Sequence, residues 1–394
     1  QAWGTHAILS VPLRLFGIDA LVAAAVLWGT MAAAAVPLSY LLAVRVSRIR
    51  RVPEAVGLAV LAWHPNMSNA GYFLSETPFL CFALAATLGL VALLQDGGWK
   101  PAITAGLTGA VAFAVRPQCA MFFALAFATW IVVRRRAPQV RVVRLVAVGL
   151  PLLFTLLFSF WRFHAHTGYG PGIAENANMN LTAGRCHNVV TQAFRSENDL
   201  ARSDRKHNTR DGRRVSIPNF RVAWKLPDGH PLALRPVLGH ESIKFVGFIG
   251  DPEIHREIRR RCYAETGLWG QVRISFVDLM LSWFVDRQWP EMERGRERFL
   301  GVLDGYRTVF QIFVLVPSLV GVGYAIARLR RRPELALVAW QVVNYMVLAA
   351  IFFGTLRLRS PYDPYAIILA AEVWGMALLW WLRRRASARE ATGR

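Results

Sequence analysis

Two arginines near the C-terminal end of the chain have the spacing of a phosphate site. Arg357 and Arg359 are two residues apart, directly before a serine-proline turn, and their forked guanidinium donors suit phosphate oxygens. Arg116 lies in a turn between two apolar runs, and Glu76 begins another apolar run. A carboxylate beside arginines could bind a divalent metal, orient an acceptor hydroxyl or hold an arginine in place. Together these residues could bind a lipid whose phosphate lies at the membrane surface.

Three further polar residues are candidates for an acceptor pocket. His64 and Asn66 end one apolar run, and Asp363 follows the two C-terminal arginines. Polar groups near a bilayer are costly unless they pair or face a cavity. We therefore interpret all three as functional candidates.

The same residues also permit purely structural interpretations. Ser75 is a natural N-cap, so Glu76 could simply be a first-turn charge that stabilises its helix. Arg357 and Arg359 could extend to lipid head groups, and Arg116 could anchor a helix end at the interface. Spacing in the sequence leaves both interpretations open.

Apolar runs long enough for membrane helices must position these candidates. The chain has 394 residues, of which 54% are hydrophobic, and its mean hydropathy is +0.32. Because about 20 consecutive apolar residues cross the hydrocarbon core, we predict an all-α polytopic membrane protein. The predicted spans are nine, at residues 20–43, 54–70, 77–94, 101–115, 118–133, 145–162, 308–327, 335–353 and 364–382.

Basic clusters orient these spans. When the spans alternate, the segments on one side contain 19 basic residues against four acidic ones, which accounts for 15 of the 21 net positive charges. That side is predicted to be cytoplasmic by the positive-inside rule. The charge therefore reflects topology, and we expect no nucleic-acid partner. The richness in Ala, Arg, Gly and Val favours a bacterial plasma membrane.

The alternation divides the chain into three parts. Residues 1–162 are an N-terminal membrane part that starts on the outer side, residues 163–305 are an extracytoplasmic loop domain, and residues 306–394 are a C-terminal membrane part with a basic cytoplasmic tail. Because the first residues fall on the outer side, at least one further span and an outer loop are expected before Gln1.

The loop domain holds two of the four cysteines. Cys186 and Cys262 could form a disulfide in an oxidising compartment, although Cys81 and Cys119 leave other pairings open. Residues 270–289 have helical spacing with Trp and Phe on one face, and could lie in the membrane interface.

Glu372 is a separate case, because it lies near the middle of the last predicted span. A buried acid at that depth is expected to pair with a polar group such as Asn344 or to be protonated. A role in proton relay is the less favoured alternative.

Four segments resemble one family of membrane enzymes, the GT-C superfamily of polytopic glycosyltransferases. The resemblance is to its branch of polyprenyl- or dolichyl-phosphate-mannose:protein mannosyltransferases and aminoarabinose transferases. It implies transfer of a sugar from a polyprenyl-phosphate donor on the outer face, with inversion, to a glycan, lipid or protein acceptor. The segments are QAWGTHAILSVPLRLFGID, HPNMSNAGYFLSETPFLCFAL, GLTGAVAFAVRPQCAMFF and FFGTLRLRSPYDPYAIILAA.

The resemblance also implies roles for particular residues. Glu76 matches the family's second acid, which assists catalysis or binds a divalent metal ion, and Arg357 or Arg359 matches the arginine that holds the donor phosphate. Arg116 is a weaker match. The family's general base lies in the first outer loop, which would precede Gln1, and it has no counterpart in this sequence.

Three other functions are compatible with the same residues. A transporter or flippase of a lipid-linked or anionic solute would also place arginines at the outer mouth, but the inverted repeats that it predicts are not evident. A non-catalytic membrane subunit would use residues 163–305 to bind a partner. A ligase that moves a whole glycan from a lipid phosphate is the third alternative.

Overall fold

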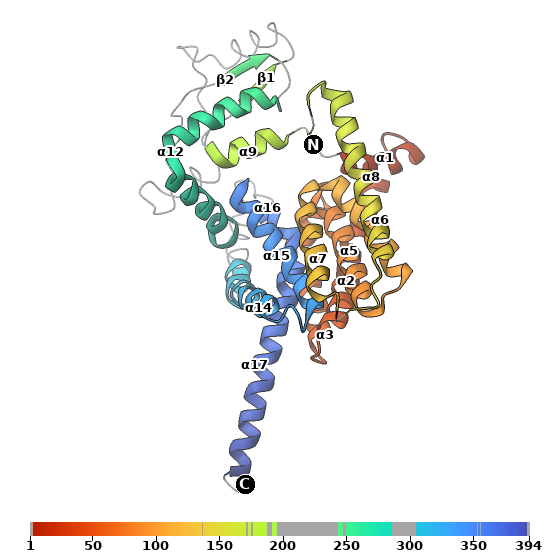
Figure 1. Cartoon of the computed structure of the whole chain (residues 1–394), viewed down its shortest axis with the longest axis vertical. Helices are drawn as coiled ribbons and strands as arrows, with labels where there is room; N and C mark the ends of the chain where they lie inside the picture. The colour runs from red at the N-terminus through yellow and green to blue at the C-terminus, as the bar shows by residue number, and fades with distance from the viewer. Residues whose placement is uncertain are drawn as a thin grey trace. The chain divides into compact units, whose positions relative to one another are not determined.

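The computed structural model describes residues 3–135, 137–170, 172–174, 176–186, 191–194, 243–246, 250–285, 305–352, 354 and 356–391 (Figure 1). Within these residues the chain is helical apart from one pair of short strands. It divides into two compact units. The first contains residues 1–3, 156–286 and 346–356, and the second contains residues 4–155, 287–345 and 357–394.

The second unit is a helical bundle that contains all the predicted site residues. Its elements are α1 (Trp3–Phe16), α2 (Leu21–Val46), α3 (Val52–Leu61), α4 (His64–Ala70), α5 (Glu76–Asp96), α6 (Trp99–Val115), the 3₁₀ turn η1 (Pro117–Cys119), α7 (Ala120–Val133), the first half of α8 (Val142–Thr167), the π-helical turn η3 (Gln311–Leu315), α14 (Val316–Ala327), most of α15 (Pro333–Ile351), α16 (Leu356–Arg359), the 3₁₀ turn η4 (Ser360–Tyr362) and α17 (Asp363–Ala391).

Six helices among the described residues are long and apolar enough to cross a membrane, so the predicted count of nine is not confirmed. These six are Leu21–Val46, Glu76–Asp96, Val142–Thr167, Gly305–Ala327, Pro333–Ile351 and Arg357–Ala388. The other three predicted spans are shorter helices. The span predicted at 54–70 is divided into α3 and α4, because Trp63 is extended and Pro65 suits the first turn of a new helix.

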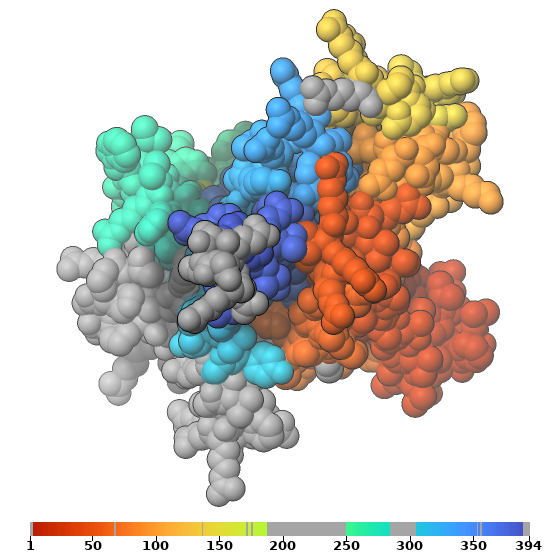
Figure 2. All heavy atoms as spheres, turned by 90° about the horizontal axis from the view of Figure 1, so that it is seen from below, coloured from red at the N-terminus to blue at the C-terminus, as the bar shows by residue number. Residues whose placement is uncertain are grey.

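Parts of the clusters at 45–51, 134–144 and 328–332, predicted to share one side of the membrane, lie at one end of the bundle, called the basic end. Arg45 at the end of α2 forms an ion pair with Asp96 at the end of α5, with 2.7 Å between Nη1 and Oδ2. The side chain of Gln139 donates to the carbonyl of Leu94. Figure 2 shows this part of the chain, with α2 and α3 in orange beside α17 in dark blue.

Glu372 belongs to the basic end, which corrects the predicted pairing with Asn344. Its Oε1 accepts from Arg332 Nη1 at 2.6 Å, and its Oε2 accepts from Ser47 Oγ at 2.6 Å. Arg332 also donates to the carbonyl of Val46. The predicted span at 364–382 starts within one residue of α17, so the start of the helix was predicted correctly. The packing of α17 was not, and it places Glu372 beside Ser47 in the loop between α2 and α3.

Helix α5 connects the basic end to the opposite end of the bundle, called the site end. It runs from Glu76 to Asp96, about 30 Å at 1.5 Å per residue. It packs closely on α6, because a Cβ added at Gly89 would lie 2.9 Å from the backbone nitrogen of Ala105. Small residues allow helix backbones to approach in this way, and α5 and α6 together carry Glu76 and Arg116 to the site end.

The first unit contains the described part of the predicted loop domain, except Gly305. Its elements are the second half of α8, α9 (Ala177–Cys186), β1 (Thr191–Phe194), β2 (Ile243–Val246), α12 (Pro252–Met280), the π-helical turn η2 (Leu281–Val285) and the end of α15. Strands β1 and β2 pair in parallel. Residues 195–242 of the predicted domain lie outside the described residues.

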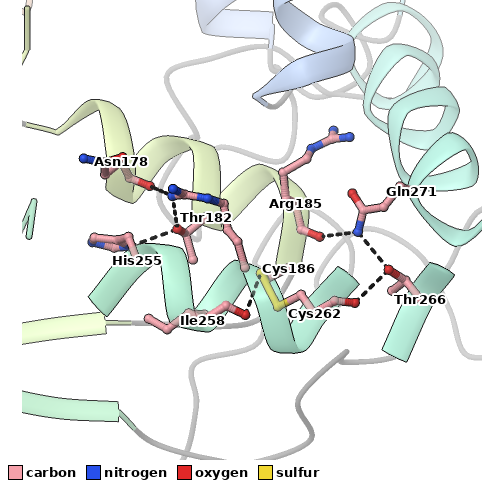
Figure 3. Close-up of a disulfide and its surroundings, with 10 residues drawn as sticks. Asn178, Thr182, Arg185, Cys186, His255, Ile258, Cys262, Thr266 and Gln271 are labelled. Atoms are coloured by element: carbon pink, nitrogen blue, oxygen red, sulfur yellow. Dashed lines mark hydrogen bonds between the residues drawn. A yellow bond between two sulfur atoms is a disulfide. The ribbon is translucent and has the colours of Figure 1, made fainter. Parts of the chain in front are cut away.

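Helices α9 and α12 are joined by a disulfide between Cys186 and Cys262, the two cysteines that the sequence places in the loop domain (Figure 3). Both cysteines are fully buried and pack around Ile258. Helix α12 is interrupted at Gly267, whose φ of 60° lies in the left-handed region that favours glycine. The two halves of α12 therefore run in different directions.

Candidate functional site

The site end gathers predicted residues from three elements that are distant in the sequence. Glu76 is the first residue of α5, and Arg116 is the C-cap of α6. Arg357 and Arg359 lie on the short helix α16, directly before α17. Helix starts and ends thus bring one carboxylate and three guanidinium groups into the same part of the bundle.

Glu76 is held between two arginines. Its Oε1 accepts from Arg116 Nη2 at 2.5 Å and from Arg357 Nε at 2.7 Å. Ser75 Oγ donates to the other oxygen, Oε2, at 3.2 Å and accepts from Arg116 Nε at 3.2 Å. We call Ser75, Glu76, Arg116 and Arg357 the Glu76 cluster. Among the roles that the sequence allowed for the carboxylate, these contacts correspond to holding arginines in place.

Ser75 stands at the N-cap position of α5 and Glu76 in its first turn, as the structural interpretation predicted. The side chain of Ser75 makes no capping hydrogen bond to the start of α5. Its hydroxyl is used by Glu76 and Arg116 instead. The negative charge of Glu76 still lies in the first turn of α5, where the helix dipole favours it.

The Glu76 cluster has an excess of positive charge in a buried setting. One carboxylate faces two guanidinium groups, and both Glu76 and Arg116 are almost completely buried, at 1% and 5% exposed. Arg116 Nη1 is buried and has no hydrogen-bond partner among the residues that the structure describes, and such a donor costs about 1 to 3 kcal/mol. The Arg357 side chain is 38% exposed. An anionic oxygen beside Arg116 would pair the donor and balance the charge.

Arg359 belongs to a second ion pair, with Asp363. Arg359 Nε lies 2.9 Å from Asp363 Oδ1, and both side chains are buried. The indole of Trp63 donates to Oδ2 of the same carboxylate at 3.0 Å. Both oxygens of Asp363 are therefore bonded and none of its surface is exposed. Its role in an acceptor pocket stays a prediction.

An aromatic pair holds the other side of Arg359. Its guanidinium carbon lies 4.2 Å from the centre of the Phe310 ring, and Phe310 stacks on Trp63 at 4.9 Å. Neither Trp63 nor Phe310 was predicted from the sequence as a site residue. With its charge balanced by Asp363, Arg359 is a weaker phosphate ligand than Arg116 or Arg357.

The remaining polar candidates connect helix α4 to its neighbours. Asn66 donates to the carbonyl of Ala32 and is buried, and the ring of the half-buried His64 lies within hydrogen-bonding distance of Ser68 Oγ. Asn69, which the sequence analysis missed, donates to Ser360 Oγ at 2.6 Å and so ties α4 to the turn after α16. Its position three residues after Asn66, on the same face of a helix, is the signal that could have identified it.

The residues around Glu76 do not fit a divalent metal ion, which the family resemblance implied. Glu76 Oε1 carries two arginines, whereas divalent cations prefer several oxygen ligands and no adjacent positive charge. The other nearby acid, Asp363, is fully engaged with Arg359 and Trp63. Among the described residues, no group of three or more His, Cys, Asp or Glu side chains could hold a metal.

No protein-family model, curated protein or solved structure matches this chain.

Proposed function

We propose that this protein is a membrane glycosyltransferase that moves a sugar from a polyprenyl-phosphate donor to an acceptor on the extracytoplasmic face. The observation that supports it best is the buried Arg116 Nη1, which has no hydrogen-bond partner in the described part of the chain and belongs to a guanidinium group close to Arg357. A phosphate oxygen is a suitable partner for such a donor, because charged pairs between guanidinium and phosphate are strong and directional. The lipid chain of the donor would lie along the apolar surface of the spanning helices.

The reaction forms one bond and breaks another at the anomeric carbon of the sugar. The acceptor oxygen, after losing its proton to a base, attacks this carbon, and the bond from the carbon to the phosphate oxygen breaks with inversion. Negative charge then develops on the departing polyprenyl phosphate. Arg116 and Arg357 would stabilise that charge, because a preorganised donor acts most strongly where charge appears in the transition state.

Glu76 positions the two arginines in this mechanism and does not act as the base. Its Oε1 is bonded to both guanidinium groups and its Oε2 to Ser75. A carboxylate held in this way is a poor proton acceptor. We therefore assign the base to a residue other than Glu76.

The proposal assigns the site end to the extracytoplasmic side of a bacterial plasma membrane. The basic end, which is about 30 Å away along α5, would then lie at the cytoplasmic surface. The acceptor would be a glycan, a lipid or a protein that reaches the outer leaflet.

A reconstituted transfer assay tests this function. The chain would be placed in liposomes with a radiolabelled polyprenyl-phosphate hexose, and a membrane extract would supply acceptors. We expect labelled product and released polyprenyl monophosphate from the wild type, and at least a tenfold loss with Arg357→Gln if it removes about 1.4 kcal/mol of transition-state stabilisation. Arg45→Gln, which removes the same charge at the basic end, is the matched control.

Two results of this assay would contradict the proposal. Movement of intact donor between leaflets without sugar transfer would favour a flippase. Neither transfer nor donor movement, with folded protein and a donor turned over by another transferase in parallel, would favour a non-catalytic subunit.

A further inference from the structure

Four large apolar side chains form an exposed stripe on the second half of α12, after the break at Gly267. Leu268, Trp269, Val272 and Phe276 are 77%, 81%, 49% and 53% exposed. Their spacing places them on one side of the helix. We call these residues the α12 stripe, and a contiguous apolar surface of this kind marks an interaction site.

The opposite side of the same helical segment is fixed within the first unit. Ile274 and Val277 are buried, and Asp278 is fully buried. The Asp278 carboxylate accepts from Arg185 Nη2 at 3.4 Å, and Gln271 donates to the Arg185 carbonyl at 3.1 Å. These contacts hold the helix in one rotation, so that the α12 stripe faces outward.

Contacts within this unit also fix the stripe near the end of a spanning helix. Arg185 Nη2 donates to the carbonyl of Ala350 at 2.6 Å, close to the end of α15. A Cβ added at Gly354 would lie 2.2 Å from the carbonyl oxygen of Asp278. Since α15 is long and apolar enough to span a membrane and ends at Ile351, a membrane crossed by α15 would have its surface near Asp278. The stripe extends from there by ten residues, at most about 15 Å along the helix.

We propose that the α12 stripe is a membrane-docking surface that inserts into the lipid interface at the end of α15. Its composition supports lipid as the occupant, because Trp is enriched where apolar chains meet head groups. Exposed Arg273 stands next to the stripe, as basic residues do on helices that lie in the interface. This inference does not depend on sugar transfer, since it rests on the contacts of α12 and on the span of α15.

A fluorescent label at position 272 tests the docking directly. The full chain, with Cys81→Ala and Cys119→Ala, would carry Val272→Cys labelled with an environment-sensitive dye, in nanodiscs of phosphatidylethanolamine and phosphatidylglycerol. The matched control is Arg260→Cys, whose side chain is 75% exposed on the first half of α12. We expect doxyl-labelled lipid to quench the label at 272 and aqueous iodide to quench the label at 260, each several-fold more than at the other position.

Two results would overturn the docking surface. Iodide quenching at position 272 equal to that at position 260 would mean that the stripe faces water. Protection of position 272 from both iodide and doxyl lipid would mean that protein covers it, either a second copy or another part of this chain. Leu268→Cys, at a still more exposed position, repeats the test if the label at 272 disturbs folding.

Discussion

Arg116 and Arg357 donate to the same oxygen of Glu76, at 2.5 Å and 2.7 Å. This shared acceptor brings the end of α6 and the helix before α17 to the start of α5. Two like charges held on one buried carboxylate repel one another, so the arrangement is stable only while the carboxylate is ionised and in place. An additional anion at the exposed side of Arg357 would relieve the repulsion, as a phosphate donor does in the proposed function.

Replacement of Glu76 should destabilise the bundle. Glu76→Gln leaves two guanidinium groups without their counter-ion, and we expect the free energy of unfolding to fall by about 3 to 5 kcal/mol. Titration with sodium dodecyl sulfate in mixed micelles, followed by circular dichroism, measures this loss.

A double-mutant cycle separates the Glu76 interaction from a general loss of packing. The double variant Glu76→Gln with Arg116→Gln should lose less stability than the sum of the two single variants, by about 1 to 3 kcal/mol. Additive losses would show that the two side chains are not coupled, which is contrary to the structure.

Two substitutions at the ion pair of Arg359 and Asp363 should lower the free energy of unfolding by different amounts. Asp363→Asn leaves buried Arg359 without a counter-ion and should cost about 3 kcal/mol. Trp63→Phe removes one hydrogen bond to Asp363 but keeps a ring against Phe310, and should cost about 1 kcal/mol. The same titration compares the two, and a larger loss for Trp63→Phe would contradict the assignment of Asp363 as the counter-ion of Arg359.

The disulfide between Cys186 and Cys262 should stabilise the first unit and leave the stability of the second unit unchanged. The cysteines are 76 residues apart, and removing a bridge over such a loop costs about 2 to 4 kcal/mol. In the variant Cys186→Ser with Cys262→Ser, amide hydrogen exchange in α9 and α12 should accelerate while α5 and α6 are unchanged. Cys81→Ala is the control, and equal exchange in both variants would mean that the bridge adds no stability.

Asp251 should make the start of α12 sensitive to acid. Its Oδ1 accepts from the backbone N–H groups of Glu253 and Ile254. Burial alone would raise the pKa of this carboxyl, but those bonds and the hydroxyl of Tyr169 outweigh burial and lower it. The pKa of Asp251 is thus lower in the folded state than in the unfolded state. Its contribution to the free energy of unfolding is therefore complete above the unfolded-state pKa of about 3.9 and is lost as the pH falls through the folded-state pKa.

Two substitutions at position 251 separate charge from capping. Asp251→Ala should cost about 1 kcal/mol at neutral pH, because the cap is lost. Asp251→Asn should keep the cap, since Asn is a good N-cap residue, but abolish the dependence on acid. Hydrogen exchange in the first turn of α12 measures both, and an unchanged acid dependence in Asp251→Asn would assign it to another group.

Part of this architecture could be predicted from the sequence because it depends on hydropathy and charge. The alternation of apolar runs with basic clusters placed Glu76, Arg116 and Arg357 at one end of the bundle, and the contacts of Arg45 and Arg332 show the basic clusters meeting at the other. These features follow from local composition, which the bilayer sorts by depth.

The individual pairings could not be predicted, because they depend on helix rotation and on where each helix starts. Glu372 was expected beside Asn344 but pairs with Arg332, because the start of α17 could be predicted from hydropathy but its packing against the loop between α2 and α3 could not. Trp63 and Phe310 were missed because their importance comes only from contact with Asp363 and Arg359. The hydropathy pattern also merged α3 and α4 into one predicted span, because it does not show the extended residue Trp63 between them.

The most direct test of the phosphate site is native mass spectrometry of the full chain in mild detergent. The protein is mixed with equal amounts of a polyprenyl monophosphate and the matching polyprenol, and the spectrum shows which lipid stays bound. The account predicts that the wild type and Arg45→Gln retain the monophosphate over the alcohol, and that Arg116→Gln and Arg116→Lys lose this preference while remaining folded. Equal retention of the two lipids by the wild type, or an undiminished preference in both Arg116 variants, would contradict the assignment of the Glu76 cluster as a phosphate site.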